Sequence, residues 1–101
     1  MDTVVLYRAV SEIELQPLMK TGKFEVVPHA LEGKFFAESA EDAATWGALL
    51  EGASGYRIVE VELPTSAANN LLRWERLDGI GPARYGELYQ LQDAIIRQFR
   101  L

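Results

Sequence analysis

Apolar and polar positions along the chain form a pattern that predicts several short strands. Residues 4–7 are β-branched or otherwise apolar and predict a buried strand that ends at Arg8. The strand predicted over residues 56–63 ends with apolar residues alternating with glutamates, which indicates one buried face and one wet face. A short buried strand is predicted over Lys34–Glu38, and a further short strand over Phe24–Val27.

Two serines predict the starts of helices. Each is followed three positions later by an acidic residue, which is the spacing of a capping box. The helix that begins at Ser11 is expected to end at Gly22, and Pro17 within it indicates a short or kinked helix. The helix that begins at Ser39 is expected to end near Gly52.

The C-terminal third is predicted to be mostly helix and loop. A short helix is expected over residues 66–72, and the glycines and proline of Arg73–Arg84 predict a loop. An amphipathic C-terminal helix is expected because four apolar residues have helical spacing: Leu88, Leu91, Ile95 and Phe99. Strands and helices are mixed without βαβ alternation, which predicts an α+β fold. We expect a single domain over residues 1–101, with a small mixed or antiparallel sheet and flanking helices.

Composition and charge narrow the classes of partner. Ten lysines and arginines against fifteen aspartates and glutamates give a net charge of -5, which argues against binding of duplex nucleic acid. The absence of cysteine excludes disulfides, thiolate catalysis and cysteine-ligated metals. His29 is the only histidine, so no metal site is predicted.

No targeting or membrane segment is recognisable in the sequence. The N-terminus carries Asp2 and lacks the basic residues and apolar run of a signal peptide, and the apolar runs are too short to span a membrane. We therefore expect no membrane partner and a cytoplasmic site of action. Export by a larger delivery system would not be visible in this sequence.

Arg8 and Ser39 are the first candidates for binding residues. Arg8 follows an apolar strand, where a guanidinium can clamp a phosphate or carboxylate, or instead pair with Glu12. Ser39 is expected to cap a helix, whose N-terminus offers N–H groups to an anion. The capping hydroxyl is also able to face a ligand.

Aromatic and acidic residues supply further candidates. Phe35 and Phe36 are adjacent on a predicted strand, so they point to opposite faces, and the outward one is free to stack on a flat ring. Trp46 is expected in the core. Glu87 precedes the expected last helix, where it is either a catalytic carboxylate or a first-turn residue that stabilises the helix dipole.

The order of these motifs resembles a known family. The motifs are, in chain order, Leu6-Tyr7-Arg8, Thr21-Gly22-Lys23-Phe24, Gly33-Lys34-Phe35-Phe36-Ala37-Glu38-Ser39, a helix with Ala43, Ala44 and Trp46, and a strand Tyr56-Arg57-Ile58-Val59-Glu60-Val61. Together they resemble small ADP-ribosyltransferase-like domains of the R-S-E type, which are often C-terminal modules of bacterial polymorphic toxins. The resemblance extends from about Val5 to Gln92.

The resemblance implies a set of functional residues. Arg8 would hold the phosphates and ribose of NAD, the substrate, and Ser39 would support the site. Glu87 matches the glutamate that assists transfer of ADP-ribose, with Glu38 and Glu75 as weaker substitutes.

The resemblance also implies a cofactor contact and a partner. Tyr7 belongs to the NAD-binding set, and whichever of Phe35 and Phe36 points outward would stack on nicotinamide. The loop over Trp74–Arg84 would contact a protein acceptor. The enzyme expected is a mono-ADP-ribosyltransferase.

A non-catalytic interaction module with an acidic docking face is the alternative. The enzyme requires Arg8, Ser39 and a carboxylate to face one cleft, whereas the binding module requires only an exposed patch.

Overall fold

The computed structural model describes residues 2–25, 33–52 and 54–100, which form an α+β fold with one antiparallel sheet, as predicted. His29 and part of the strand predicted over Phe24–Val27 lie outside these residues. The elements in chain order are β1 (Thr3–Val10), α1 (Glu12–Thr21), β2 (Gly33–Ala37), α2 (Ala40–Glu51), β3 (Arg57–Pro64), α3 (Thr65–Asn69), β4 (Leu72–Leu77), β5 (Gly81–Glu87), the 3-10 helix η1 (Leu88–Leu91) and β6 (Ile95–Phe99).

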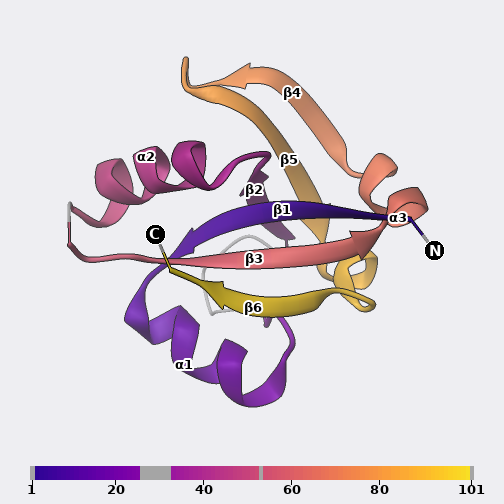
Figure 1. Ribbon diagram of the computed structural model, residues 1–101, viewed down its shortest axis with the longest axis horizontal. Helices are drawn as coiled ribbons and strands as arrows, with labels where there is room; N and C mark the ends of the chain where they lie inside the picture. Colours follow the sequence, from indigo (N-terminus) through magenta and orange to yellow (C-terminus); the bar gives the residue numbers. More distant parts are fainter. Residues whose placement is uncertain (1, 26–32, 53, 101) are drawn as a thin grey trace.

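The strands form one continuous sheet, but few backbone pairs join its two halves in the middle. Its strand order is β4-β5-β2-β1-β3-β6, and every neighbouring pair is antiparallel. β1 pairs with β3 along its whole length, whereas β1 and β2 share only the Tyr7–Ala37 pair among the described residues. β2 and β5 pass behind β1 and β3 at a steep angle, and β4 lies beside β5 at the top of the view (Figure 1). The two halves of the sheet therefore diverge on either side of this one pair.

The helices cover both faces of the sheet (Figure 1). α1, α3 and η1 pack on one face, named here the α1 face, over a large cluster that includes Leu6, Phe36 and Val59. α2 packs on the other, the α2 face, over a smaller cluster around Ala37 and Ile58. Because side chains alternate along a strand, neighbouring residues such as Phe35 and Phe36 serve different faces.

The predicted helix starts are confirmed. The Ser11 hydroxyl accepts a hydrogen bond from the Glu14 N–H at 3.2 Å, and the Ser39 hydroxyl accepts one from the Asp42 N–H at 3.1 Å. α1 ends before Gly22 although Pro17 lies inside it, and α2 ends before Gly52. The short helix predicted over residues 66–72 is also present, at Thr65–Asn69.

The predicted C-terminal helix is wrong. Residues 88–91 form only the 3-10 helix, and 95–99 form the strand β6, which extends the sheet by pairing with β3. Ile96 packs on the α1-face cluster, while Ile95 is 55% exposed. Apolar residues four apart fit a helix equally well, but the free edge of β3 offers backbone hydrogen bonds that decide in favour of a strand.

The predicted loop over Arg73–Arg84 is also wrong, because most of it forms the β4–β5 hairpin. Asp78 and Gly79 both have positive φ, at 56° and 73°, and the Ile80 N–H donates to the Leu77 carbonyl at 3.0 Å. Asp-Gly is a preferred pair for the central positions of such a tight hairpin turn. The glycines therefore indicated a tight turn between strands and not an extended loop.

No helix within residues 2–25, 33–52 and 54–100 combines the length and apolar character needed to cross a bilayer.

Candidate functional site

A cavity of about 430 Å³ lies where β1 and β2 diverge. Its walls come from β1, β2, α2 and the β4–β5 hairpin: Tyr7, Arg8, Ala9, Phe35, Phe36, Ala37, Ala43, Trp46, Leu50, Leu77, Asp78 and Ala83. Its volume falls in the range of small-molecule sites, which are mostly apolar with a few polar groups. The cavity is therefore the candidate binding site.

Small side chains keep this space open. Four alanines contribute to the walls, two from the central strands, one from α2 and one from β5: Ala9, Ala37, Ala43 and Ala83. α2 nevertheless packs closely on the sheet, since a side chain at Gly47 would collide with the Tyr56 ring and with Ala9. α2 thus touches the sheet at Gly47, while the nearby walls carry small alanine side chains. A hollow therefore remains between the rest of α2 and the sheet.

The two adjacent phenylalanines have separate roles, as predicted. Phe36 is 2% exposed and packs edge-on against Phe24 in the α1-face cluster, with ring centroids 5.6 Å apart. Phe35 is 37% exposed and contacts the rings of Tyr85 and Trp74, at centroid distances of 4.8 and 5.9 Å. Phe35 is therefore the outward residue, and its ring is accessible at the cavity.

Arg8 is held by protein groups at the edge of the cavity. Its Nε and Nη2 donate to the two carboxylate oxygens of Glu14 at 2.9 and 3.0 Å. Its Nη1 donates to the Phe35 carbonyl at 3.1 Å, so the side chain bridges from β1 and α1 to β2 where backbone pairing stops. The alternative pairing with Glu12 is wrong, because Glu12 binds Arg57 instead, at 3.1 Å.

Ser39 and Glu87 do not line the cavity. Ser39 is the N-cap of α2. Glu87 pairs with Gly33 at the far end of β5, and its backbone N–H donates to the Gln90 side chain at 2.9 Å. The cavity lies at the other end of β5, at Ala83. This cavity therefore brings Arg8 together with neither Ser39 nor Glu87.

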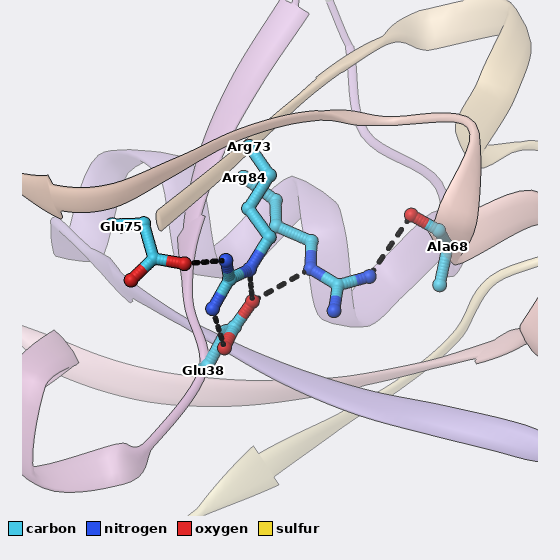
Figure 2. Close-up of polar contacts among 5 residues, drawn as sticks. All are labelled: Glu38, Ala68, Arg73, Glu75 and Arg84. Atoms are coloured by element: carbon cyan, nitrogen blue, oxygen red, sulfur yellow. Dashed lines mark hydrogen bonds and ion pairs between the residues drawn. The ribbon is translucent and has the colours of Figure 1, made fainter. Parts of the chain in front are cut away.

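Glu38 belongs to a separate polar network (Figure 2). Its Oε2 accepts from the Nε atoms of Arg73 and Arg84 at 2.7 and 2.8 Å, and Oε1 accepts from Arg73 Nη2 at 3.2 Å. Arg84 also donates to the Ala68 carbonyl at 3.0 Å, and Arg73 to Glu75 at 3.1 Å. Figure 2 shows the two guanidinium groups meeting at this one carboxylate.

The network fixes the charge of Glu38. Hydrogen bonds from Arg73 and, to a smaller extent, from Arg84 lower the pKa of Glu38 to about 2, although partial burial opposes the shift. The same pairing raises the pKa of Arg73. The network joins the end of β2 to β4, β5 and α3, and neither Glu38 nor Glu75 lines the cavity.

Asp78 supplies the carboxylate of the cavity wall. Its Oδ2 accepts a hydrogen bond from Trp46 Nε1 at 3.1 Å, which joins the tip of the hairpin to α2. The sequence interpretation missed both residues as site components, since it placed Trp46 in the core and residues 73–84 in a loop. The signal for Asp78 was its place before Gly79, which predicts an ordered hairpin tip.

Within residues 2–25, 33–52 and 54–100, no three histidine, aspartate or glutamate side chains gather in a way that would hold a metal ion. The chain matches no protein-family model, no curated protein and no solved structure.

Proposed function

We propose that the cavity binds the nicotinamide end of NAD and that the chain is an ADP-ribosyltransferase-like domain that modifies a protein. The observation that carries this proposal is the cavity between the diverging strands β1 and β2, with the aromatic residues Phe35 and Trp46 in its walls and Arg8 at its edge. Stacking of the flat nicotinamide ring on these aromatic side chains would contribute to the free energy of binding.

Arg8 has N–H donors to spare for a phosphate of a dinucleotide. A guanidinium has five N–H donors, and the contacts to Glu14 and the Phe35 carbonyl use three of them, which leaves two for a phosphate oxygen. The Glu14 pair fixes the orientation of the fork before a ligand arrives, which lowers the entropic cost of binding.

This site differs from the one that the family resemblance implied. Ser39 stabilises α2 as its N-cap and thereby supports the helix that carries Trp46, but it makes no wall of the cavity. The proposal rests on Arg8, Phe35 and Trp46 together and does not require Ser39 to face the cavity.

Calorimetric titration of the chain with NAD tests the proposal. Binding is expected, and Phe35→Leu and Trp46→Leu should each weaken it about tenfold or more, since stacking of a base contributes about 1–3 kcal/mol. Trp74→Leu is the matched control, because Trp74 contacts Phe35 but lies outside the cavity wall. Nicotinamide mononucleotide should compete with NAD, whereas AMP should compete weakly.

Failure of the folded wild-type chain to bind NAD would overturn the proposal. It would favour the alternative, an interaction module that docks a basic protein through acidic residues, in keeping with the net charge of -5. A second feature of the fold favours an interaction module through apolar contacts: β4 is an edge strand whose Leu72 and Trp74 side chains are exposed.

A further inference from the structure

We infer that Asp78 is the catalytic carboxylate of this site, placed to stabilise the sugar cation that forms when the nicotinamide–ribose bond of NAD breaks. This inference rests on the proposed function. It assigns the role to the tip of the β4–β5 hairpin, which the family resemblance did not identify.

The position of Asp78 is fixed from several directions. The turn at the tip of the hairpin fixes the backbone of Asp78, with a hydrogen bond from the Ile80 N–H to the Leu77 carbonyl at 3.0 Å. Arg76 Nε donates to the Gly79 carbonyl at 3.1 Å and braces the next residue. The Trp46 indole N–H donates to Asp78 Oδ2 at 3.1 Å. A charge held in place before the reaction is the arrangement that stabilises a transition state at least cost.

The contact with Trp46 also places the carboxylate beside the wall on which the nicotinamide ring is proposed to stack. Trp46 is a wall of the cavity on which the nicotinamide ring is proposed to stack, and its N–H holds one carboxylate oxygen at that wall. A nicotinamide bound there would have its ribose bond close to this edge of the cavity. The carboxylate thus lies where positive charge develops on the sugar.

Two other carboxylates near the sheet are held elsewhere. Glu14 accepts hydrogen bonds from Arg8 with both oxygens, and Glu38 accepts from Arg73 and Arg84 with both of its own. Among the described residues that make the cavity wall, Asp78 provides the one carboxylate.

The reaction can be written with its atoms and charges balanced. The bond between the ribose C1′ and the nicotinamide nitrogen breaks, and its electron pair goes to the ring nitrogen, so nicotinamide leaves as a neutral molecule. The C1′ centre becomes positive and is stabilised by the negative Asp78. An acceptor hydroxyl or water then bonds to C1′ through its oxygen and releases its proton to solvent water, while Asp78 is unchanged.

Asp78→Asn removes the charge of the side chain but keeps its shape. The asparagine oxygen still accepts the Trp46 hydrogen bond, and asparagine tolerates a positive φ, so the hairpin should keep its shape. Release of nicotinamide from NAD should fall about 10²-fold or more, the scale for loss of one transition-state electrostatic partner, while NAD affinity stays within a few-fold. Asp93→Asn is the matched control, since Asp93 is exposed and lies outside the cavity wall.

Two further variants decide between the competing roles. If Asp78 only docks the hairpin on α2, Trp46→Phe should lower turnover as much as Asp78→Ala, and Asp78→Asn should leave it unchanged. A loss in Glu87→Gln with none in Asp78→Asn would move the role to Glu87. Melting temperatures of all variants report whether a loss comes from unfolding.

The outcomes also separate this inference from the proposed function. A wild-type chain that binds no NAD overturns both. A wild-type chain that binds NAD without releasing nicotinamide, or an Asp78→Asn variant with undiminished turnover, overturns the catalytic role of Asp78 and leaves NAD binding in place.

Discussion

The two faces of the sheet are packed in different ways. The α1 face is filled by large aliphatic residues, and side chains such as Val59, Val61 and Leu63 are completely buried there. The α2 face has a smaller cluster, in which alanines such as Ala37 and Ala43 stand where larger residues would fill the cavity. One face therefore supplies most of the buried apolar surface, and the other leaves space for a ligand.

Polar contacts reinforce the same division. Arg8 of the central strand β1 binds Glu14 of α1, and the Glu38 network joins β2 to β4, β5 and α3. The Arg8 contacts bridge the diverging strands β1 and β2, which share a single residue pair among the described residues. The fold thus tolerates a cavity on one face because the other face is both packed and cross-linked.

The largest expected effect comes from the adjacent phenylalanines, which test the two faces directly. Phe36→Ala should lower the free energy of unfolding by about 3–5 kcal/mol, since it opens a hole in a close-packed core. Phe35→Ala should cost distinctly less, because that ring is already 37% exposed. Urea denaturation of both variants measures the difference, and equal losses would contradict the distinction between the faces.

Arg8→Ala is expected to have the next largest effect. It leaves the Glu14 carboxylate and the Phe35 carbonyl without their donor, which should cost about 1.5–3 kcal/mol. Arg8→Lys is the control, because it keeps the charge but not the paired hydrogen bonds. The free energies of unfolding of both variants, measured by denaturation with and without NAD, check this prediction. A chain that loses no stability on Arg8→Ala would show that the bridge between β1 and β2 contributes little.

The smallest expected effect is that of Glu38→Gln, which should cost about 1 kcal/mol at neutral pH because the pairs of this network are partly exposed. The folded-state pKa of Glu38 is lowered to about 2, below the ordinary value near 4.3 in an unfolded chain. Between these values the unfolded chain binds more protons, so the contribution of Glu38 is complete above about pH 4.3 and is lost as pH falls towards 2.

Denaturation of wild type and Glu38→Gln across this range measures the effect. The stability difference between the two proteins should shrink on acidification. A difference that is constant from pH 7 to pH 3 would mean that the arginines bind Glu38 without stabilising the fold.

Local signals in the sequence determined the α+β class, the helix starts at Ser11 and Ser39, and the opposite orientations of Phe35 and Phe36. Each depends on contacts within a few residues, such as a serine hydroxyl and an N–H three positions later. The Asp78-Gly79 turn was equally local, and it was missed because nearby glycines and a proline were interpreted as a loop.

Only the tertiary structure decided the rest. β6 is a strand because β3 has a free edge, and Arg8 pairs with Glu14 and not Glu12 because of how α1 lies against β1. The cavity forms where four separate parts of the chain meet: β1, β2, α2 and the β4–β5 hairpin. No sequence pattern within any one of these parts predicts the size of the cavity or the carboxylate in its wall. Long-range packing sets such a site because it fixes distances between residues that the chain itself leaves independent.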